Sequence, residues 1–219
     1  TEVFRVTSLA TVPVTEHVSA VHHEAAGTDW IVFCHGFRSD KTGSYEYRSR
    51  RAVEEGYDAV RFDFRGCGES DGDFVDSTLS SRVADLEAVL DYFDPVSFVL
   101  FGSSFGGAVA FHAAAGDDRA EAVATRAPVT YGAFDDLRTT VEAEGEVRFD
   151  GERRIDVRFL DDLDRHDFAD VETGLGCPVA IFHGDDDESV AIGDSFRAAE
   201  RLGVDVVLQK YVGEGHRFS

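Results

Sequence analysis

The stretch from Ser97 to Phe111, SFVLFGSSFGGAVAF, decides the fold. Its first five residues form an apolar run that is typical of a buried strand, and its last residues are typical of the start of a helix. Between them, Gly102 to Gly106 matches the pattern G-x-S-x-G, with Ser104 at its centre. A strand, a tight turn and a helix in this order are the setting in which this pattern exposes a serine nucleophile.

Ser104 is therefore the candidate nucleophile. A serine at the N-terminus of a helix lies where backbone N–H groups can stabilise an anion. Ser103 is the other serine of the turn, but its spacing to the glycines does not fit the pattern. The pattern alone also arises by chance in glycine-rich turns whose serine has no chemical role. The strand before it and the helix after it favour the catalytic interpretation.

Outward from this turn, short apolar runs alternate with amphipathic stretches, which predict strands and helices respectively. Such an alternation produces βαβ units, so we predict the α/β class: a mostly parallel, doubly wound sheet with helices on both faces. We expect strands at Trp30–Cys34, Ala59–Phe62, Ser97–Phe101, Ala122–Thr125, Val179–Phe182 and Val204–Lys210, and helices at about 44–55, 78–93, 105–116 and 189–202.

Two segments depart from this alternation. Residues 1–23 carry spaced valines and are expected to form antiparallel strands at the edge of the sheet. Residues 131–173 contain Asp150-Gly151 between short alternating runs at 147–149 and 153–159, which is a hairpin signal. We therefore predict a single domain, residues 1–219, with a small cap insertion at about 131–173.

The charge is strongly negative, with 43 acidic against 21 basic residues and a net charge of −22. Lys41 and Lys210 are the only lysines. Salt screens the self-repulsion of such a chain, and this composition is typical of proteins that work in molar salt. We infer a halophile, with an ordinary acidic protein as the alternative. Binding to nucleic acid or to an anionic membrane is disfavoured, because no basic patch offsets phosphate repulsion.

The cysteines and the apolar runs limit the other classes of function. Cys34, Cys67 and Cys177 are odd in number and form no C-x-x-C pair, so neither a disulfide framework nor a zinc site is expected. Reduced thiols and the lack of a secretory signal predict a cytoplasmic protein. No stretch of about 18 apolar residues is present, so we expect no membrane span.

A serine nucleophile needs a histidine base and an acid that orients the base, in the chain order Ser, acid, His. His216 follows the last predicted strand and is the candidate base. The acid is expected after the strand at 179–182, where residues 185–188 are four consecutive acids. Any of the four fits by position, so the order of the motifs leaves this choice open.

The loop after the strand Trp30–Cys34, His35-Gly36-Phe37, is the candidate for stabilising the oxyanion of a tetrahedral intermediate. We expect the backbone N–H groups of Phe37 and Phe105 to donate to that oxyanion. His35 itself is interpreted as a structural residue that bonds within its loop. Phe37, Phe105, Tyr131 and Phe134 are candidates for an apolar acyl pocket, with ordinary packing as the alternative for the last two.

Five motifs together resemble the α/β-hydrolase superfamily: H-G-F at 35–37, D-F-R-G-x-G-x-S at 63–70, G-x-S-x-G-G at 102–107, H-G-x-x-D-x-x-V at 183–190 and G-x-x-H at 213–216. The branch that they resemble contains small esterases, monoacylglycerol lipases and serine aminopeptidases, including the cinnamoyl-esterase type. The resemblance runs from about residue 30 to 219. It implies that Asp187 is the acid, because the aspartate of H-G-x-x-D has that role in the family. It also implies that the 63–70 loop shapes the site without reacting.

The resemblance implies a serine hydrolase that acts through an acyl-enzyme on Ser104. We expect its substrates to be small to medium, uncharged acyl esters, because the segment at 131–173 carries 14 acidic residues against six arginines and would repel anions. No metal or organic cofactor is expected, and the partner is a small-molecule acyl substrate. A peptidase, a thioesterase and an acyltransferase use the same triad and remain alternatives. A ligand-binding homologue without activity is an alternative of another class, although an intact triad argues against it.

Overall fold

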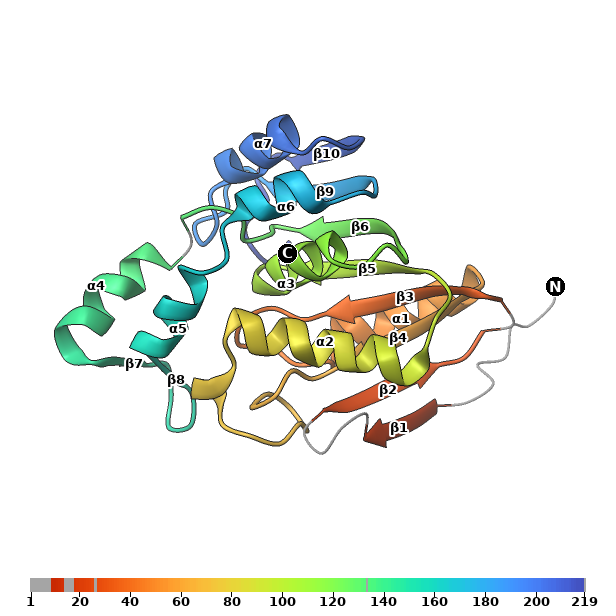
Figure 1. Cartoon of the computed structure of the whole chain (residues 1–219), viewed down its shortest axis with the longest axis horizontal. Helices are drawn as coiled ribbons and strands as arrows, with labels where there is room; N and C mark the ends of the chain where they lie inside the picture. Colours follow the sequence, from red (N-terminus) through yellow and green to blue (C-terminus); the bar gives the residue numbers. More distant parts are fainter. Residues whose placement is uncertain (1–8, 14–17, 26, 133, 219) are drawn as a thin grey trace.

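The computed structural model describes residues 9–13, 18–25, 27–132 and 134–218. Their largest element is a mixed sheet of eight strands (Figure 1). The strands are β1 (Leu9–Pro13), β2 (Ser19–His23), β3 (Asp29–Cys34), β4 (Tyr57–Phe62), β5 (Phe98–Ser103), β6 (Ala120–Arg126), β9 (Val179–Gly184) and β10 (Val206–Tyr211). The main helices are α1 (Ser44–Glu54), α2 (Leu79–Phe93), α3 (Phe105–Ala115) and α7 (Ile192–Arg201), and η1 (Phe74–Asp76) is a short 3₁₀ turn.

The strands follow the order β1-β2-β4-β3-β5-β6-β9-β10. All pairs from β4 to β10 are parallel, whereas β2 runs antiparallel to both β1 and β4. The predicted α/β class with a mostly parallel sheet is confirmed, and each expected strand and helix is present. The antiparallel edge strands are also confirmed at β1 and β2. Residues 1–8 and 14–17 of that prediction lie outside the described residues.

Successive side chains of the central strands pack against helices on opposite faces of the sheet. Val32 and Cys34 of β3 belong to the main hydrophobic core, which includes the buried side of α3. Phe33, between them, packs with Tyr45 and Val53 of α1 in a second cluster. This alternation follows from the two-residue period of a strand. Figure 1 shows the result, with α2 and α3 in front of the sheet and α1 behind it.

The segment between β6 and β9 folds into α4 (Asp135–Glu144), β7 (Glu146–Arg148), β8 (Arg154–Asp156), α5 (Val157–Leu163) and α6 (Phe168–Gly174). The predicted hairpin is confirmed, because β7 and β8 pair antiparallel around Asp150-Gly151. Its second strand is shorter than expected. The Asp156 side chain accepts a hydrogen bond from the Arg158 N–H at 3.0 Å and so starts a helix at Val157.

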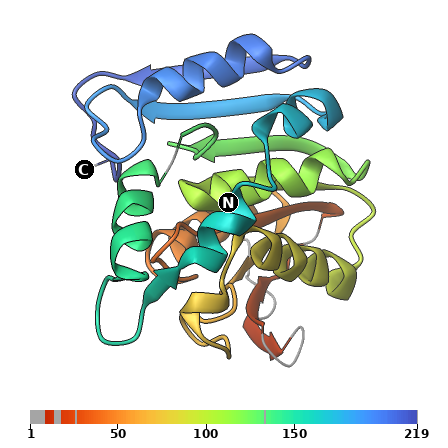
Figure 2. The same ribbon diagram turned by 60° about the vertical axis from the view of Figure 1, so that its left-hand side comes forward.

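This segment lies at one end of the sheet, the end toward which β3 runs (Figures 1 and 2). Ring contacts join it to the loop that follows β3. Phe37 packs at 5.0 Å from Phe134, 5.6 Å from Phe149 and 5.2 Å from Phe159, measured between ring centroids. Its last helix, α6, instead packs against α3 on the face of the sheet. The carboxyl end of the central strands is thus the end that the predicted cap adjoins.

Candidate active site

Ser104 occupies a strained turn between β5 and α3. Its backbone φ of 54° and ψ of −121° lie where residues other than glycine are rare. The Ser104 N–H donates to the Arg126 carbonyl oxygen at 2.9 Å, which ties the turn to β6. A Cβ atom on Gly102 would lie 2.3 Å from the Gly106 oxygen, and one on Gly106 would lie 2.3 Å from the Cys34 oxygen. The two glycines of the motif therefore allow the strand and the helix to meet closely enough to hold Ser104 in this conformation.

His216 and Asp187 form a hydrogen-bonded pair. His216 Nδ1 lies 2.7 Å from Asp187 Oδ2, and the Asp187 side chain is fully buried while that of His216 is 23% exposed. A carboxylate only accepts hydrogen bonds, so Nδ1 carries the proton and Nε2 is left as a base. Burial opposes ionisation of Asp187. Hydrogen bonds from the Val190 N–H, from His216 and from the Ser189 N–H outweigh burial and hold the pKa of this carboxyl below its usual value.

The four consecutive acids after β9 have different partners. Asp185 accepts hydrogen bonds from Lys210 Nζ and from the Gly213 N–H, which holds the loops after β9 and β10 together. Asp186 and Glu188 are exposed. Among these four, Asp187 is the one that contacts His216. The same contacts explain why α7 begins at Ile192 and not near residue 189, because the preceding amides bond to Asp187.

His183 is a buried residue of this site to which the sequence assigned no role. Its Nε2 lies 3.0 Å from the Val190 carbonyl oxygen and 3.2 Å from Asp187 Oδ2, and its Nδ1 lies 2.7 Å from Ser195 Oγ. A carbonyl oxygen only accepts, so Nε2 carries the proton and the serine hydroxyl donates to Nδ1. The Nε2–H group of His183 thus faces the Asp187 carboxylate on its side away from solvent. It was visible in the sequence only as the first letter of H-G-x-x-D.

The two amides expected to form an oxyanion hole are fixed by their surroundings. Phe105 is the first residue of α3, so its N–H has no acceptor within the helix. The Gly36 carbonyl, on the peptide that carries the Phe37 N–H, accepts from His35 Nδ1 at 2.8 Å and from Arg82 Nη1 at 3.5 Å. Arg82 Nη2 also donates to the Phe37 carbonyl at 2.8 Å. His35 is buried and bonds in its own loop, as predicted.

Arg82 was not identified from the sequence, where it is one arginine of an amphipathic helix. It is fully buried, and burial lowers the pKa of its guanidinium. Aromatic faces surround it and favour its charge. The guanidinium carbon lies between 4.9 and 5.9 Å from the ring centroids of Phe37, Phe64, Phe74 and Phe105. Arg82 thus links the loop after β3 to the aromatic core beneath it.

A cavity of about 1020 Å³ is lined by Ser104, His216 and Phe37 together. Phe105 is buried beneath it, and its ring lies 5.5 Å from that of Phe37. The other two candidates for an acyl pocket do not line this cavity in the described part of the chain. Phe134 packs against the rings of Phe37 and Phe105. Tyr131 instead hydrogen-bonds to Glu172 and stacks under Arg197.

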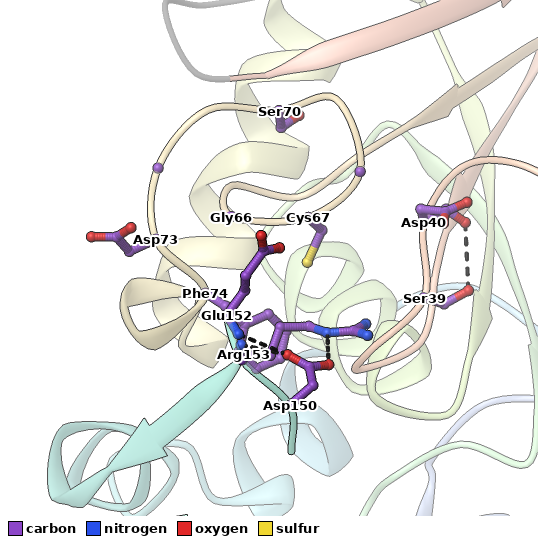
Figure 3. A pocket seen from close by; sticks show the side chains of 13 residues that line it. Ser39, Asp40, Gly66, Cys67, Ser70, Asp73, Phe74, Asp150, Glu152 and Arg153 are labelled. Atoms are coloured by element: carbon purple, nitrogen blue, oxygen red, sulfur yellow. Dashed lines mark hydrogen bonds and ion pairs between the residues drawn. The ribbon is translucent and has the colours of Figure 1, made fainter. Parts of the chain in front are cut away.

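A second cavity, of about 850 Å³, lies beside the first between the loop after β4 and the hairpin turn (Figure 3). Ser39 and Asp40 line both cavities. Arg153 crosses from the hairpin, donating from Nε to Asp150 Oδ2 at 2.7 Å and from Nη1 to the Arg38 carbonyl at 2.8 Å. The hairpin is thereby attached to the loop that holds Phe37.

The loop of the D-F-R-G-x-G-x-S motif is held by its first residue. Asp63 is fully buried and accepts hydrogen bonds from the Lys41 N–H at 2.6 Å, from Lys41 Nζ and from the Glu69 N–H at 2.9 Å. Cys67 of the same loop faces the second cavity (Figure 3), and burial raises the pKa of its thiol. These contacts fix the course of the loop.

Other features of the described residues bear on cofactors and membranes. No group of three or more His, Cys, Asp or Glu side chains in them is arranged to hold a metal ion. All three cysteines are free and buried. None of the helices in the described ranges is both long and apolar enough to cross a membrane.

Residues 31–217 match the sequence profile described as "Alpha/beta hydrolase family". The chain belongs to the alpha/beta hydrolase family. The strands from β4 to β10, the turn at Ser104 and the Asp187–His216 pair all lie within the matched residues, whereas β1 and β2 precede them. Hydrolase chemistry is the coarse function that membership of this family supports.

Curated relatives of this alpha/beta hydrolase include two mammalian proteins named "Palmitoyl-protein thioesterase ABHD10, mitochondrial". The human protein is 29% identical over 203 residues, which cover 83% of this chain and 65% of that protein. The mouse protein is 31% identical over 205 residues, which cover 84% of this chain and 68% of that protein. The chain thus spans about two thirds of the length of these relatives.

Solved structures show the same fold. A structure of Est1E from Butyrivibrio proteoclasticus with ferulic acid bound has a TM-score of 0.80 at 21% identity, covering 92% of this chain and 89% of that one. The structure of alpha/beta hydrolase domain-containing protein 10 from mouse has a TM-score of 0.76 at 24% identity, covering 96% and 91%. A monoacylglycerol lipase from Paleococcus ferrophilus has a TM-score of 0.78 at 17% identity, covering 91% and 90%.

Proposed function

We propose that this alpha/beta hydrolase is a serine hydrolase that cleaves small to medium acyl esters through an acyl-enzyme on Ser104. One observation carries the proposal: a serine in a strained strand-to-helix turn lines the same cavity as a histidine whose Nδ1 bonds to a buried carboxylate. A nucleophile, a base and an orienting acid are the components that acyl transfer to serine requires.

The reaction follows from the roles of these groups. His216 Nε2 takes the proton of Ser104 as Oγ attacks the carbonyl carbon, and Asp187 stabilises the imidazolium that forms. The N–H groups of Phe37 and Phe105 donate to the oxyanion, and each such donor is worth about 3 kcal/mol in the transition state. His216 then protonates the leaving group. Water, activated by the same histidine, releases the acyl group from Ser104.

We assign the acyl group to the apolar side of the cavity, next to the Phe37 ring. Three rings from the segment between β6 and β9 pack against this ring, with centroids within 5.6 Å of its own: Phe134, Phe149 and Phe159. We propose that the segment at about 131–173 is a cap that shapes this side of the cavity. An acyl chain of small to medium length that is apolar where it meets these rings suits such a lining.

A thioesterase is the second candidate, and the names of the curated relatives favour it. A thioester is attacked in the same way, with a thiolate as the leaving group. The two candidates are distinguished by comparing oxygen and sulfur esters of the same acyl chain.

The proposal is tested by the hydrolysis of p-nitrophenyl acetate, butyrate and octanoate, with the matching S-acyl thiocholines, in about 2–3 M KCl. Ser104→Ala is compared with Ser103→Ala, which changes the neighbouring serine. We expect Ser104→Ala to lower kcat by about 10³-fold or more, and Ser103→Ala to leave at least a tenth of the wild-type rate. Equal losses in both variants, or a folded wild type that turns over neither series, would contradict the proposal.

A further inference from the structure

The cavity around Ser104 is lined by more arginines than acidic residues, four against three, although the chain as a whole has a net charge of −22. Four arginines line it: Arg38, Arg48, Arg126 and Arg217. None of the four has a carboxylate within 4 Å in the described part of the chain, whereas arginines elsewhere on the surface, such as Arg50 and Arg138, are paired with acids. In so acidic a protein, unpaired arginines gathered at one cavity require an explanation.

Arg48 is held in place by neutral neighbours. It lies on α1, and its Nη1 donates to Ser44 Oγ at 2.6 Å. The guanidinium carbon lies 5.1 Å from the centroid of the Phe101 ring and 5.6 Å from that of Tyr45. These contacts orient the planar guanidinium and leave its charge without an acidic partner.

Arg126 lies at the end of β6, directly beside the nucleophile. Its carbonyl oxygen accepts the Ser104 N–H at 2.9 Å, and its Nη1 donates to the Arg217 carbonyl at 2.9 Å. Its Nε is buried and has no hydrogen-bond partner among the described residues. A buried donor without an acceptor is costly, so the guanidinium of Arg126 has unused hydrogen-bonding capacity at the edge of the cavity that it lines.

The two arginines repel each other. Burial lowers the pKa of the Arg48 guanidinium, and the positive charge of Arg126 lowers it further. The phenol of Tyr45 lies near both, and its pKa is raised by burial although the two guanidinium groups oppose that shift. An anion placed between the guanidinium groups would relieve this repulsion and satisfy the unused donors.

We propose that Arg48 and Arg126 form a subsite for a carboxylate group of the substrate, beside Ser104. A guanidinium presents a planar fork that matches a carboxylate, which favours this ligand class. The inference rests on the proposed function and narrows its substrate to an acyl ester that bears a carboxylate away from the scissile bond. It departs from the expectation of an uncharged ester, which was drawn from the acidity of the segment at 131–173 and not from the charges that line the cavity.

Acidic side chains also line the cavity, but they do not neutralise this pair. Asp40 accepts hydrogen bonds from the Thr42 N–H and hydroxyl. Asp186 and Glu188 lie in the exposed loop after β9. In the described ranges, no carboxylate oxygen of these three residues lies within 4 Å of a guanidinium nitrogen of Arg48 or Arg126.

The test compares matched esters that differ only in charge. One pair places the charge on the acyl side: mono-p-nitrophenyl adipate and its methyl ester. The other places it on the leaving group: 4-carboxyphenyl butyrate and its methyl ester. The readout is the ratio of kcat/KM for the charged and uncharged members, measured at the lowest KCl concentration that keeps the protein folded, because salt weakens the contact. Arg48→Gln, Arg126→Gln and the double variant are compared with Arg50→Gln, which changes a surface arginine of the same helix.

We expect wild type to favour the carboxylate in one of the two pairs by about tenfold or more, and the double variant to bring that ratio near one. Arg50→Gln should keep the wild-type ratio. Two results would overturn the subsite, provided that uncharged esters are still hydrolysed. One is a wild-type ratio at or below one in both pairs. The other is a ratio that stays unchanged in the double variant.

If wild type hydrolyses none of these esters, the proposed function fails and the subsite is tested by binding. Calorimetry with Ser104→Ala should then show tighter binding of the carboxylate member of one pair than of its methyl ester. The preference should be lost when Arg48→Gln and Arg126→Gln are added. Equal binding of both members would overturn the subsite in this case as well.

Discussion

At the scale of the residue, the site depends on which of several similar side chains is held where it can act. Four acids follow β9, and Asp187 is the one that is buried, bonded by two backbone amides and in contact with His216. A carboxylate held in this way fixes the tautomer of the histidine and stabilises its charged form. Its neighbour Asp186 has the same chemistry in an exposed position.

This difference predicts unequal effects of the same substitution at adjacent positions. Asp187→Asn should lower kcat for p-nitrophenyl butyrate by on the order of 10³–10⁴, because the amide favours the wrong tautomer of His216. Asp186→Asn should change kcat less than about threefold. Both variants are measured with thermal melts to confirm folding. If Asp186→Asn is the slower enzyme, the acid is assigned wrongly.

At the scale of the element, the turn between β5 and α3 positions Ser104, the proposed nucleophile. The turn is tight because Gly106 lies against the loop that follows β3, where a Cβ atom would be 2.3 Å from the Cys34 oxygen and 2.4 Å from the His35 oxygen. Both contacts are with backbone, which cannot move without shifting β3. Gly116, just after the end of the same helix, has ordinary space around it, with the Ala113 oxygen 3.7 Å from a Cβ position.

Gly106→Ala should therefore lower the free energy of unfolding by about 3 kcal/mol or more, as overpacking of a rigid site does. Gly116→Ala should change it by no more than about 0.5 kcal/mol, because that position is exposed and unstrained. Urea denaturation of both variants beside wild type measures the difference. Equal stabilities would show that the close contact at Gly106 does not constrain the turn.

The elements of the fold and the residues of the candidate site could be predicted from sequence to different extents. The strands, the helices and Ser104 follow from local patterns, and His216 follows from its place after the last strand. Asp187 could be chosen only through the family resemblance, because any of the four consecutive acids after β9 fits the order of the motifs. Arg82 and His183 could not be found, since their roles arise from contacts with Phe37 and Asp187 that form only in the folded chain. The run expected at 153–159 ends as a strand at Asp156, and its last three residues begin α5 because the Asp156 side chain caps that helix.

At the scale of the whole molecule, two properties concern charge. A net charge of −22 on 219 residues opposes a compact fold at low salt. Three buried or half-buried histidines oppose a compact fold at acidic pH, because they fold in their neutral form. Burial lowers the pKa of His23 and of His112 to about 4 and that of His35 to about 3, from an ordinary value of 6.5.

The melting temperature should rise steeply between about 0.1 and 3 M KCl, because the Debye length falls from about 10 Å to less than 3 Å. The control is a variant in which several exposed acids are replaced by their amides, which should melt higher at low salt and respond less. A flat response of the wild type would leave the acidic composition without a role in salt adaptation.

Stability should also fall as the pH is lowered from about 7 to 5. The folded pKa of each buried histidine lies below its unfolded value, so the unfolded chain binds more protons below about pH 6.5. Each such histidine then costs up to about 1.4 kcal/mol per pH unit. His112→Gln should show a shallower slope of unfolding free energy against pH than wild type in urea denaturation. An identical slope would mean that His112 is not held neutral by the fold.

The assignment of Ser104 as the nucleophile, activated by His216 and Asp187, can be tested directly. Its most direct test is covalent labelling with a serine-directed fluorophosphonate, followed by intact mass spectrometry and mapping of the labelled peptide. We predict one adduct per chain, on Ser104, that Ser103→Ala retains and Ser104→Ala abolishes, with labelling slowed by Asp187→Asn. Labelling that persists in Ser104→Ala, or a folded wild type that takes up no label, would contradict the account.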